Sequence, residues 1–322
     1  MTDHAAIQID RLVRRYGHTD AVNGLTLEVK PGRCYGFFGR NGAGKTTTIK
    51  CLLNLLRPTS GTVRVFGLDP RKAEVAVKSR IAYVPHHVAF YPWMTVRQTL
   101  DYLAAFRARW NRATESALLE RFRLDLLKNT THLSKGQRTQ LALITAICAE
   151  PELLVLDEPS AGLDPIVRRE FIEAVIGAYQ EGDPGRRTVF VSTHLIAEFE
   201  GLIDEFTIIE DGRAVLSADA DRARDHYQKV YARFAAPLRG TLDLGAARVL
   251  KQDGREIGVL AEGDAERVGE RLKTRSPEVV KTESLTLEEI FVAALQPARA
   301  SAGLGAAATR CWSCRSGCTR VE

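Results

Sequence analysis

Residues 39–47, with the sequence GRNGAGKTT, have the types and spacing that bind the phosphates of a nucleotide. The segment fits the pattern G-x-x-x-x-G-K-[ST], in which glycines let successive backbone N–H groups turn toward an anion. Lys45 is expected to reach the β- and γ-phosphates, and the Thr46 hydroxyl to hold Mg²⁺. Because an ordinary glycine turn can share this composition, the flanking elements decide the interpretation.

The flanking sequence supplies the strand and the helix that a phosphate loop requires. Residues 34–38 form a short apolar run typical of a buried strand, and residues 48–56 carry Ile and Leu at helical spacing. The N-terminus of that helix would add about half a positive charge at the loop. Strand, loop and helix together predict a nucleotide-binding protein.

Two carboxylates stand at the end of a second apolar strand. Residues 153–156 (LLVL) precede Asp157 and Glu158, and ligands of open α/β sheets bind at this end of the strands. Attack of water on a phosphate needs one carboxylate for the metal and another to polarise the water. His194 follows a later β-rich run, 188–192, and is expected at the same edge. The alternatives are a solvated strand end and a surface histidine.

Residues 133–137 (LSKGQ) open a helix in a way that local stability does not fully explain. Ser134 and Gln137 have the spacing of a capping box. Gly136, however, costs about 1 kcal/mol relative to Ala within a helix. The glycine is understandable if another group must approach the backbone closely. Further on, Asp164 is expected to cap the next helix, with Pro165 at its first position.

The composition is typical of a globular protein that does not itself cross a membrane. Hydrophobic residues make up 45% and charged residues 26% of the 322 residues. The net charge of +5 arises mainly from residues 298–322, where four Arg face one Glu, and the nearly neutral remainder gives no reason to expect nucleic acid. Apolar runs fall short of the ~18 residues of a membrane span, and the N-terminus lacks a signal-peptide pattern. We expect a cytoplasmic protein that serves a membrane only through a partner.

Six cysteines in a chain of this length do not indicate a disulfide framework. The first three lie in apolar patterns and are expected in the core. Cys311, Cys314 and Cys318 have the spacing C-x₂-C-x₃-C, but a closed zinc site needs four ligands. The Ala-rich stretch before them favours disorder over metal binding.

The order of the predicted elements indicates an α/β fold with two inserted parts. Strands at 7–15, 25–29 and 62–66 predict an antiparallel β subdomain beside the phosphate loop. Helices between the core strands predict an α-helical subdomain at about residues 86–150. An Asp-Gly hairpin at 206–215 ends the core.

The first helix of that subdomain is expected to start at Thr95 and to carry Leu100, Leu103, Phe106 and Trp110 on one face. A second helix is expected at 114–122.

A small α+β C-terminal domain is predicted after the core. Its expected strands are 229–234, 256–260 and 279–282, and its expected helices are 265–273 and 286–295. The whole prediction is a P-loop NTPase core at 5–216, this accessory domain at 217–297, and a disordered tail at 298–322.

These motifs, in this order, resemble the ATP-binding subunit of an ABC transporter over residues 5–215. The segments 91–96 and 285–291 are similar to those of ABC-2 type subunits, which are mostly exporters. The resemblance implies a chain that binds ATP and Mg²⁺, hydrolyses ATP and drives a separately encoded membrane permease from the cytoplasmic face of the membrane. It also implies a second ATP-binding subunit, identical or different, and no nucleic acid.

The resemblance implies a role for each matching residue. Tyr16 would stack on adenine, Asp157 would hold Mg²⁺ through water, and Glu158 would polarise the attacking water. His194 would contact the γ-phosphate and Glu158. The catalytic residues would be Lys45, Glu158 and His194, and the metal ligands Thr46 and Asp157. The residues implied in nucleotide binding are Tyr16, Gly39, Asn41, Gly42, Gly44, Lys45, Thr46, Thr47, His86, Ser134, Gly136, Gln137 and Asp164. Of these, Ser134 and Gly136 would complete the site of the opposite subunit.

One position departs from the family pattern. After the strand at 81–85 the family usually has Gln, which touches Mg²⁺ and water, and here it is His86. A neutral His could accept the same hydrogen bond, whereas a protonated His would repel Mg²⁺. The alternative is that His86 points into the helical subdomain and that His87 or neither touches the site.

Two other functions compete with a transporter subunit. A soluble ABC ATPase of translation or nucleic-acid processing would carry two cassettes or a long coiled coil, and this chain has one cassette and no such insertion. In a P-loop kinase for a small molecule, the LSKGQ helix would have no function.

Overall fold

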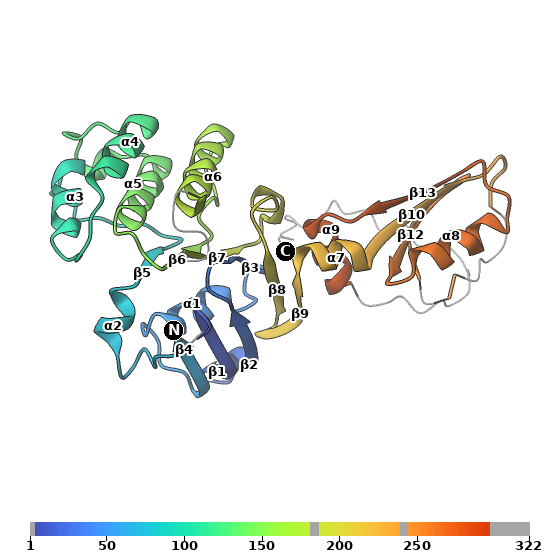
Figure 1. Cartoon of the computed structure of the whole chain (residues 1–322), viewed down its shortest axis with the longest axis horizontal. Helices are drawn as coiled ribbons and strands as arrows, with labels where there is room; N and C mark the ends of the chain where they lie inside the picture. Colours follow the sequence, from blue (N-terminus) through green and yellow to red (C-terminus); the bar gives the residue numbers. More distant parts are fainter. Residues whose placement is uncertain (1–3, 181–186, 239–243, 246, 297–322) are drawn as a thin grey trace, which may run out of the picture.

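The structure, a computed structural model, describes residues 4–180, 187–238, 244–245 and 247–296. Its centre is a six-stranded sheet with the order β5-β6-β7-β3-β8-β9 (Figure 1). The strands of this sheet are β3 (Cys34–Gly39), β5 (Ile81–Val84), β6 (Leu153–Asp157), β7 (Thr188–Thr193), β8 (Glu205–Glu210) and β9 (Arg213–Asp219). The first five in spatial order are parallel, and β9 runs antiparallel to β8.

A three-stranded antiparallel sheet, β2-β1-β4, packs below the central sheet in Figure 1. Its strands are β1 (Ile7–Tyr16), β2 (Thr19–Val29) and β4 (Ser60–Val65). Apolar residues of both sheets and of α1 (Lys45–Leu52) form one buried cluster. Helix α1 ends at Leu52, whereas the sequence predicted helix to residue 56. Asn54 takes a positive φ of 55°, a left-handed conformation that cannot continue an α-helix.

The other face of the central sheet is covered by helices that share a second buried cluster with it. The helices on this face are α3 (Val96–Ala104), α4 (Arg112–Phe122), α5 (Lys135–Ile147) and α6 (Pro165–Gln180). The short helix α2 (Glu74–Lys78) precedes them in the chain, and 3₁₀ turns lie at Thr130–His132 and Ile196–Glu198. The prediction for α3 was wrong beyond Ala104, where the helix ends. Phe106, predicted on its apolar face, is 71% exposed. Trp110 lies outside the helix and donates through Nε1 to Glu115. Asn111 caps the new helix α4, which requires non-helical chain before it.

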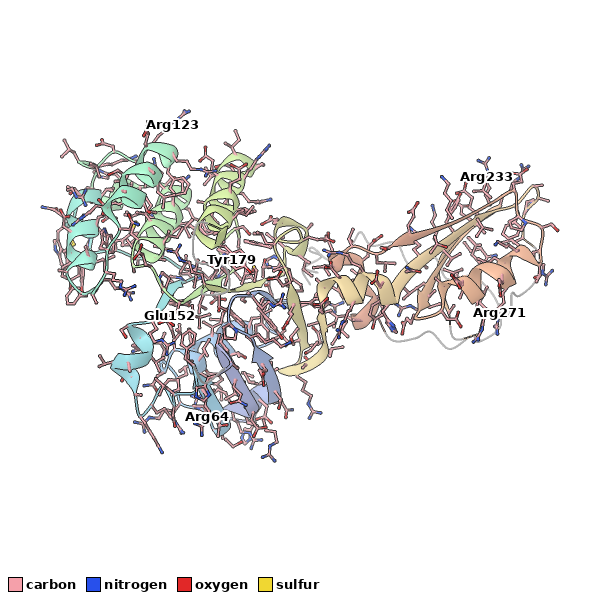
Figure 2. The ribbon with its side chains drawn as sticks, viewed as in Figure 1. Arg64, Arg123, Glu152, Tyr179, Arg233 and Arg271 are labelled. Atoms are coloured by element: carbon pink, nitrogen blue, oxygen red, sulfur yellow. The ribbon has the colours of Figure 1, made fainter. Side chains whose placement is uncertain are left out.

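An arm extends from the central sheet on the right of Figure 1. It consists of a four-stranded antiparallel sheet, β11-β12-β10-β13, with α8 packed on it around a separate apolar core. Figure 2 shows Arg271 on this arm, Arg64 in the three-stranded sheet and Arg123 among the helices. The elements after β9 are α7 (Ala220–His226), β10 (Tyr227–Arg233), β11 (Arg248–Asp253), β12 (Glu256–Glu262), α8 (Ala265–Lys273), β13 (Val279–Ser284) and α9 (Leu287–Leu295).

Two helices join the arm to the core. Buried residues of α7 and α9, such as Ala223 and Ile290, belong to the same apolar cluster as the central sheet. The sequence did not predict α7. The division between core and accessory domain near residue 217 stays a prediction. The tail at 298–322, with Cys311, Cys314 and Cys318, lies outside the described residues.

The predicted fold class is confirmed: an α/β P-loop core carries an antiparallel β part, a helical part and a small α+β part. Within the ranges that the structure describes, no helix is both long enough and apolar enough to cross a membrane.

Candidate active site

The carboxyl ends of parallel strands bring the predicted catalytic residues to one edge of the central sheet. Strand β3 leads into the phosphate loop, β6 ends at Asp157, and β7 ends one residue before His194. Asp157 pairs with Ser192 across β6 and β7, and β3 lies directly beside β7. Segments more than 100 residues apart in the chain therefore meet where ligands of open α/β sheets bind.

The phosphate loop owes its shape to glycines that side chains could not replace. Gly44 has a φ of 103°, and a Cβ built on it would lie 2.3 Å from the carbonyl oxygen of Ala21. A Cβ on Gly39 would lie 2.7 Å from the carbonyl oxygen of Ile209. Helix α1 begins at Lys45 with no side-chain cap. Its first N–H groups therefore remain as donors for an anion.

Lys45, Glu158 and His194 form a connected cluster beside this loop. The Lys45 Nζ lies 2.8 Å from Glu158 Oε1, and both side chains are less than a tenth exposed. The same ammonium donates to the carbonyl oxygen of Gly39 at 2.7 Å and to that of Arg40 at 3.2 Å. On its other side, Glu158 Oε2 lies 2.8 Å from Nδ1 of His194. The carboxylate is thus held between a lysine and a histidine.

The backbone of Glu158 is in a conformation that is rare for a residue with a side chain. Its φ is 48°, and such strain persists only where the surroundings impose it. The Glu158 N–H donates to the carbonyl oxygen of Ser192 at 2.8 Å, which ties it to β7. This turn directs the Glu158 carboxylate toward Lys45 rather than along the strand.

Thr46 and Asp157 offer oxygen ligands that fit Mg²⁺. The Thr46 hydroxyl donates to Asp157 Oδ1 at 3.2 Å. The other oxygen, Oδ2, is buried and makes no hydrogen bond of normal geometry. Burial raises the pKa of Asp157, and the charge of Glu158 raises it further, while the hydroxyls of Thr46 and Ser192 lower it. A cation would stabilise this buried carboxylate, and Mg²⁺ commonly takes one or two protein oxygens beside phosphates.

His86 follows β5 and lies within electrostatic reach of the two carboxylates. Burial lowers its pKa, as does the charge of neighbouring His87, whereas the charges of Asp157 and Glu158 raise it. The rings of His86 and His87 are 4.3 Å apart. The balance favours the neutral imidazole, which can accept a hydrogen bond. Its predicted place beside the metal stays a prediction.

The signature residues lie at the exposed start of α5. Ser134 and Gln137 form the predicted capping box, with the Ser134 hydroxyl accepting from the Gln137 N–H at 3.1 Å. A Cβ on Gly136 would lie 3.1 Å from Cγ1 of Val167, so α6 supplies a reason within the chain for this glycine. Among the described residues, no hydrogen bond or ion pair joins residues 134–137 to the phosphate loop of the same chain.

In the described part of the chain, no hydrogen bond or ion pair joins the remaining predicted residues to the catalytic cluster. Tyr16 ends β1 and is 45% exposed, with the guanidinium of Arg14 over its ring at 4.6 Å. Asp164 caps α6, accepting from two N–H groups of its first turn at 3.1 Å. Asn41 and Gly42 are exposed in the phosphate loop, and Thr47 is half-buried. Their nucleotide contacts stay predictions.

Three further residues near the site were not predicted from the sequence. The hydroxyls of Tyr83 and Ser192 lie beside Asp157, and Lys135 donates to the carbonyl oxygen of Ala161. Burial and the charge of Asp157 raise the pKa of Tyr83, so its phenol stays protonated. Tyr83 and Ser192 could have been expected near the site because β5 and β7 end there. Lys135 could have been expected there because it belongs to the signature segment.

The chain matches the family model described as ABC transporter over residues 22–161. It is 36% identical to the Nod factor export ATP-binding protein I of Paraburkholderia xenovorans, over 66% of this chain and 70% of that protein. It is 34% identical to the bacitracin transport ATP-binding protein of Bacillus licheniformis, over 69% and 72%. An ABC transporter ATP-binding protein of Bacillus subtilis is 25% identical over 89% of this chain and 97% of its own length.

Solved structures agree with these relatives. The structure of an ATP binding subunit of an ABC transporter superimposes with a TM-score of 0.62 at 27% identity, covering 68% of this chain and 92% of that one. An ATP-binding cassette bound to ADP and Pi has a TM-score of 0.59 at 20% identity, which supports the fold. The chain belongs to the ATP-binding subunits of ABC transporters, a family of ATPases that use ATP and Mg²⁺.

Proposed function

We propose that this chain powers export of a substrate through a separately encoded membrane permease. In this proposal, ATP closes two ATP-binding subunits on each other, and hydrolysis lets them reopen. The cluster of Lys45, Glu158 and His194 beside the phosphate loop is the observation that carries the proposal. The direction rests on relatives whose names state Nod factor export and daunorubicin resistance.

The internal ion pair gives Glu158 a defined part in the reaction. Lys45 is now shared by Glu158 and two loop carbonyls. Phosphate oxygens would compete for that ammonium and leave Glu158 free to accept a proton from water. His194 would hold the carboxylate in place through Oε2. Mg²⁺, bound through Thr46 and Asp157, would neutralise charge on the phosphates.

The second subunit would supply what this chain's own site lacks. Ser134 is exposed, and in the part of the chain described its hydroxyl bonds only to the Gln137 N–H of its capping box. A helix N-terminus of this kind favours an anion. We assign it to the γ-phosphate bound by the opposite subunit.

We place the permease contact at an aromatic cleft next to His86. The cleft has a volume of about 500 Å³ and lies between β5, the segment after it, α3 and α5. Tyr91, Tyr102 and Trp110 line it, and Trp93 beside it is 68% exposed. Exposed aromatic patches of this kind mark protein interfaces.

A half-buried arginine adds a polar preference to this cleft. Arg107 lines it and donates to the carbonyl oxygens of Ile81 and Lys78 at 3.1 and 3.4 Å. Burial lowers the pKa of Arg107, and no carboxylate pairs with it among the described residues. A permease segment with apolar side chains and one carboxylate would fit.

Co-purification with the product of an adjacent gene tests the proposal. A membrane protein encoded beside this chain should bind it, and Tyr102→Ala with Arg107→Gln should weaken that binding while basal ATPase activity stays unchanged. A soluble ABC ATPase of translation or nucleic-acid processing would instead purify with ribosomes or nucleic acid and without a membrane partner. That result would reject the proposed export function for this chain.

A further inference from the structure

Lys135 reaches from the start of α5 to the loop that follows Glu158. Its Nζ donates to the carbonyl oxygen of Ala161 at 2.6 Å. The N–H of Ala161 in turn donates to the carbonyl oxygen of Glu158 at 3.2 Å. Two hydrogen bonds therefore link the first turn of the signature helix to the backbone of the carboxylate that faces Lys45.

The loop leaves space for this lysine. Gly162, the residue after Ala161, has a φ of 71°, and a Cβ built on it would lie 2.7 Å from Lys135 Nζ. A side chain at position 162 would strain the backbone and displace the ammonium. The missing side chain at Gly162 therefore leaves room for the Lys135 ammonium.

The charge of Lys135 acts on a residue that the catalytic carboxylates also affect. It lies close enough to His86 to lower the pKa of that imidazole, which also senses Asp157 and Glu158. Another nearby lysine, Lys128, reaches only the signature side and donates to the Gln137 side chain at 3.2 Å. Lys135 is thus the lysine of this segment that contacts the loop at 158–164.

We propose that Lys135 is a positioning residue that couples the start of α5 to Glu158 within one chain. When α5 moves with the helical part, the lysine carries the loop at 158–164 with it. The strained backbone of Glu158 is anchored to β7 by Ser192 on one side and to α5 through Ala161 on the other. This goes beyond the proposed function, in which the start of α5 acts only on the opposite subunit's site.

Kinetics of single variants give the first test. Lys135→Ala should lower kcat by about three- to tenfold, the value of an ordinary hydrogen bond, because Lys135 is exposed and acts on Glu158 only through Ala161. KM for ATP should change little, because the Lys135 ammonium is bonded to the carbonyl oxygen of Ala161 in its own chain. Lys135→Arg should recover much of kcat, and Lys78→Ala, on exposed α2, should behave as wild type. A rise in KM with unchanged kcat would overturn the proposal.

A double-mutant cycle with Gly162 tests the contact itself. Gly162→Ala displaces the ammonium, so adding Lys135→Ala to it should cost less than about twofold more in kcat, since coupled residues are non-additive. Fully multiplicative losses would overturn the proposal. The cycle needs no assumption about a second subunit, so it can fail while the proposed function stands. Thermal unfolding of each variant checks that it is folded.

Mixed dimers separate an effect on the same chain from one on the partner; this arm rests on the proposed dimer. One copy carries Lys45→Ala, which disables its own phosphate loop, and the other carries Lys135→Ala. The remaining site then combines the phosphate loop of the Lys135→Ala copy with the intact signature of the other. The proposal predicts the same loss of kcat as in the single variant. Full activity, relative to a Lys45→Ala and wild-type pair, would overturn it.

Discussion

The phosphate-loop side and the signature side of this chain differ in how their polar groups are satisfied. Beside the phosphate loop, Lys45 and Glu158 are buried and hold each other at 2.8 Å. At the start of α5, Ser134 is exposed, and its hydroxyl bonds only to the Gln137 N–H of its capping box in the described chain. Beside the phosphate loop the charged groups hold one another, whereas the Ser134 end of α5 makes no hydrogen bond to that loop among the described residues. The difference supports the second subunit that we propose.

On the phosphate-loop side, Glu158→Gln should lower ATP turnover more than any other variant considered. It removes the only base we assign, so ATP turnover should fall by about two to four orders of magnitude. ATP binding should be retained, because the variant also relieves Lys45 of its internal partner. Glu152→Gln, at the other end of β6 (Figure 2), is the matched control and should turn over normally. Wild-type turnover in Glu158→Gln would contradict the assignment.

His194→Ala should have the next largest effect. The histidine holds Glu158 Oε2 at 2.8 Å, and losing a hydrogen bond to a charged group corresponds to about 10- to 100-fold in rate. We expect a lower kcat and a nearly unchanged KM for ATP. His226→Ala, on the distant α7, serves as the control. If His194→Ala raised KM alone, the histidine would bind nucleotide rather than position the base.

Gly136 gives a test of the signature side that separates two explanations. A Cβ there would meet Val167 of the same chain at 3.1 Å, whereas our account requires approach by a phosphate of the opposite subunit. Gly136→Ala should lower ATPase activity by roughly tenfold, about the value of one strong contact. If the phosphate explanation holds, Gly136→Ala with Val167→Ala should stay defective. Full recovery in the double variant would show that the glycine serves only internal packing.

His86→Gln should change ATPase activity least among these variants, and only at acidic pH. Burial and His87 lower the pKa of His86 from its usual value near ~6.5, so the ring is neutral at pH 7. It gains a charge only as the pH falls well below neutral, and that charge would oppose Mg²⁺. ATPase activity of wild type should therefore decline in acid, and His86→Gln should flatten that decline at saturating Mg-ATP. Superimposable pH–rate profiles would place His86 outside the catalytic shell.

The sequence was sufficient for the fold class and for the strands that end at the site. Local patterns such as the glycine loop, LLVL before Asp157 and the capping box at Ser134 act over a few residues, so they could be read directly. The contact of Glu158 with both Lys45 and His194 could not, because it depends on a positive φ at Glu158 and on strand order. The sequence gives no local signal for either.

Helices were mispredicted where tertiary contacts override spacing. Phe106 and Trp110 continue the apolar spacing of α3, yet the chain leaves the helix at Ala104. Asn111 then begins α4, and Glu115 binds the Trp110 indole. Helix α7 was missed because Asp219 and the charged residues after it carry a weak apolar pattern, although Ala220 and Ala223 are buried.

The central claim is that each ATP site combines two subunits. Its most direct test places the same two substitutions either on different copies or on one copy of a mixed dimer. In one mixed dimer, Lys45→Ala is on one copy and Ser134→Arg on the other, so one composite site has an intact loop and an intact signature. In the second, both substitutions are on one copy and the partner is wild type, so neither site is intact.

The measurement is the ATPase rate of the two mixed dimers, purified through different tags on the two copies. Our account predicts about half of the wild-type rate per dimer for the first if the two sites act independently, and close to none for the second. Higher activity in the second dimer would show that each chain completes its own site, and equal rates near half of wild type would show that Ser134 belongs to neither site; either result would contradict the account.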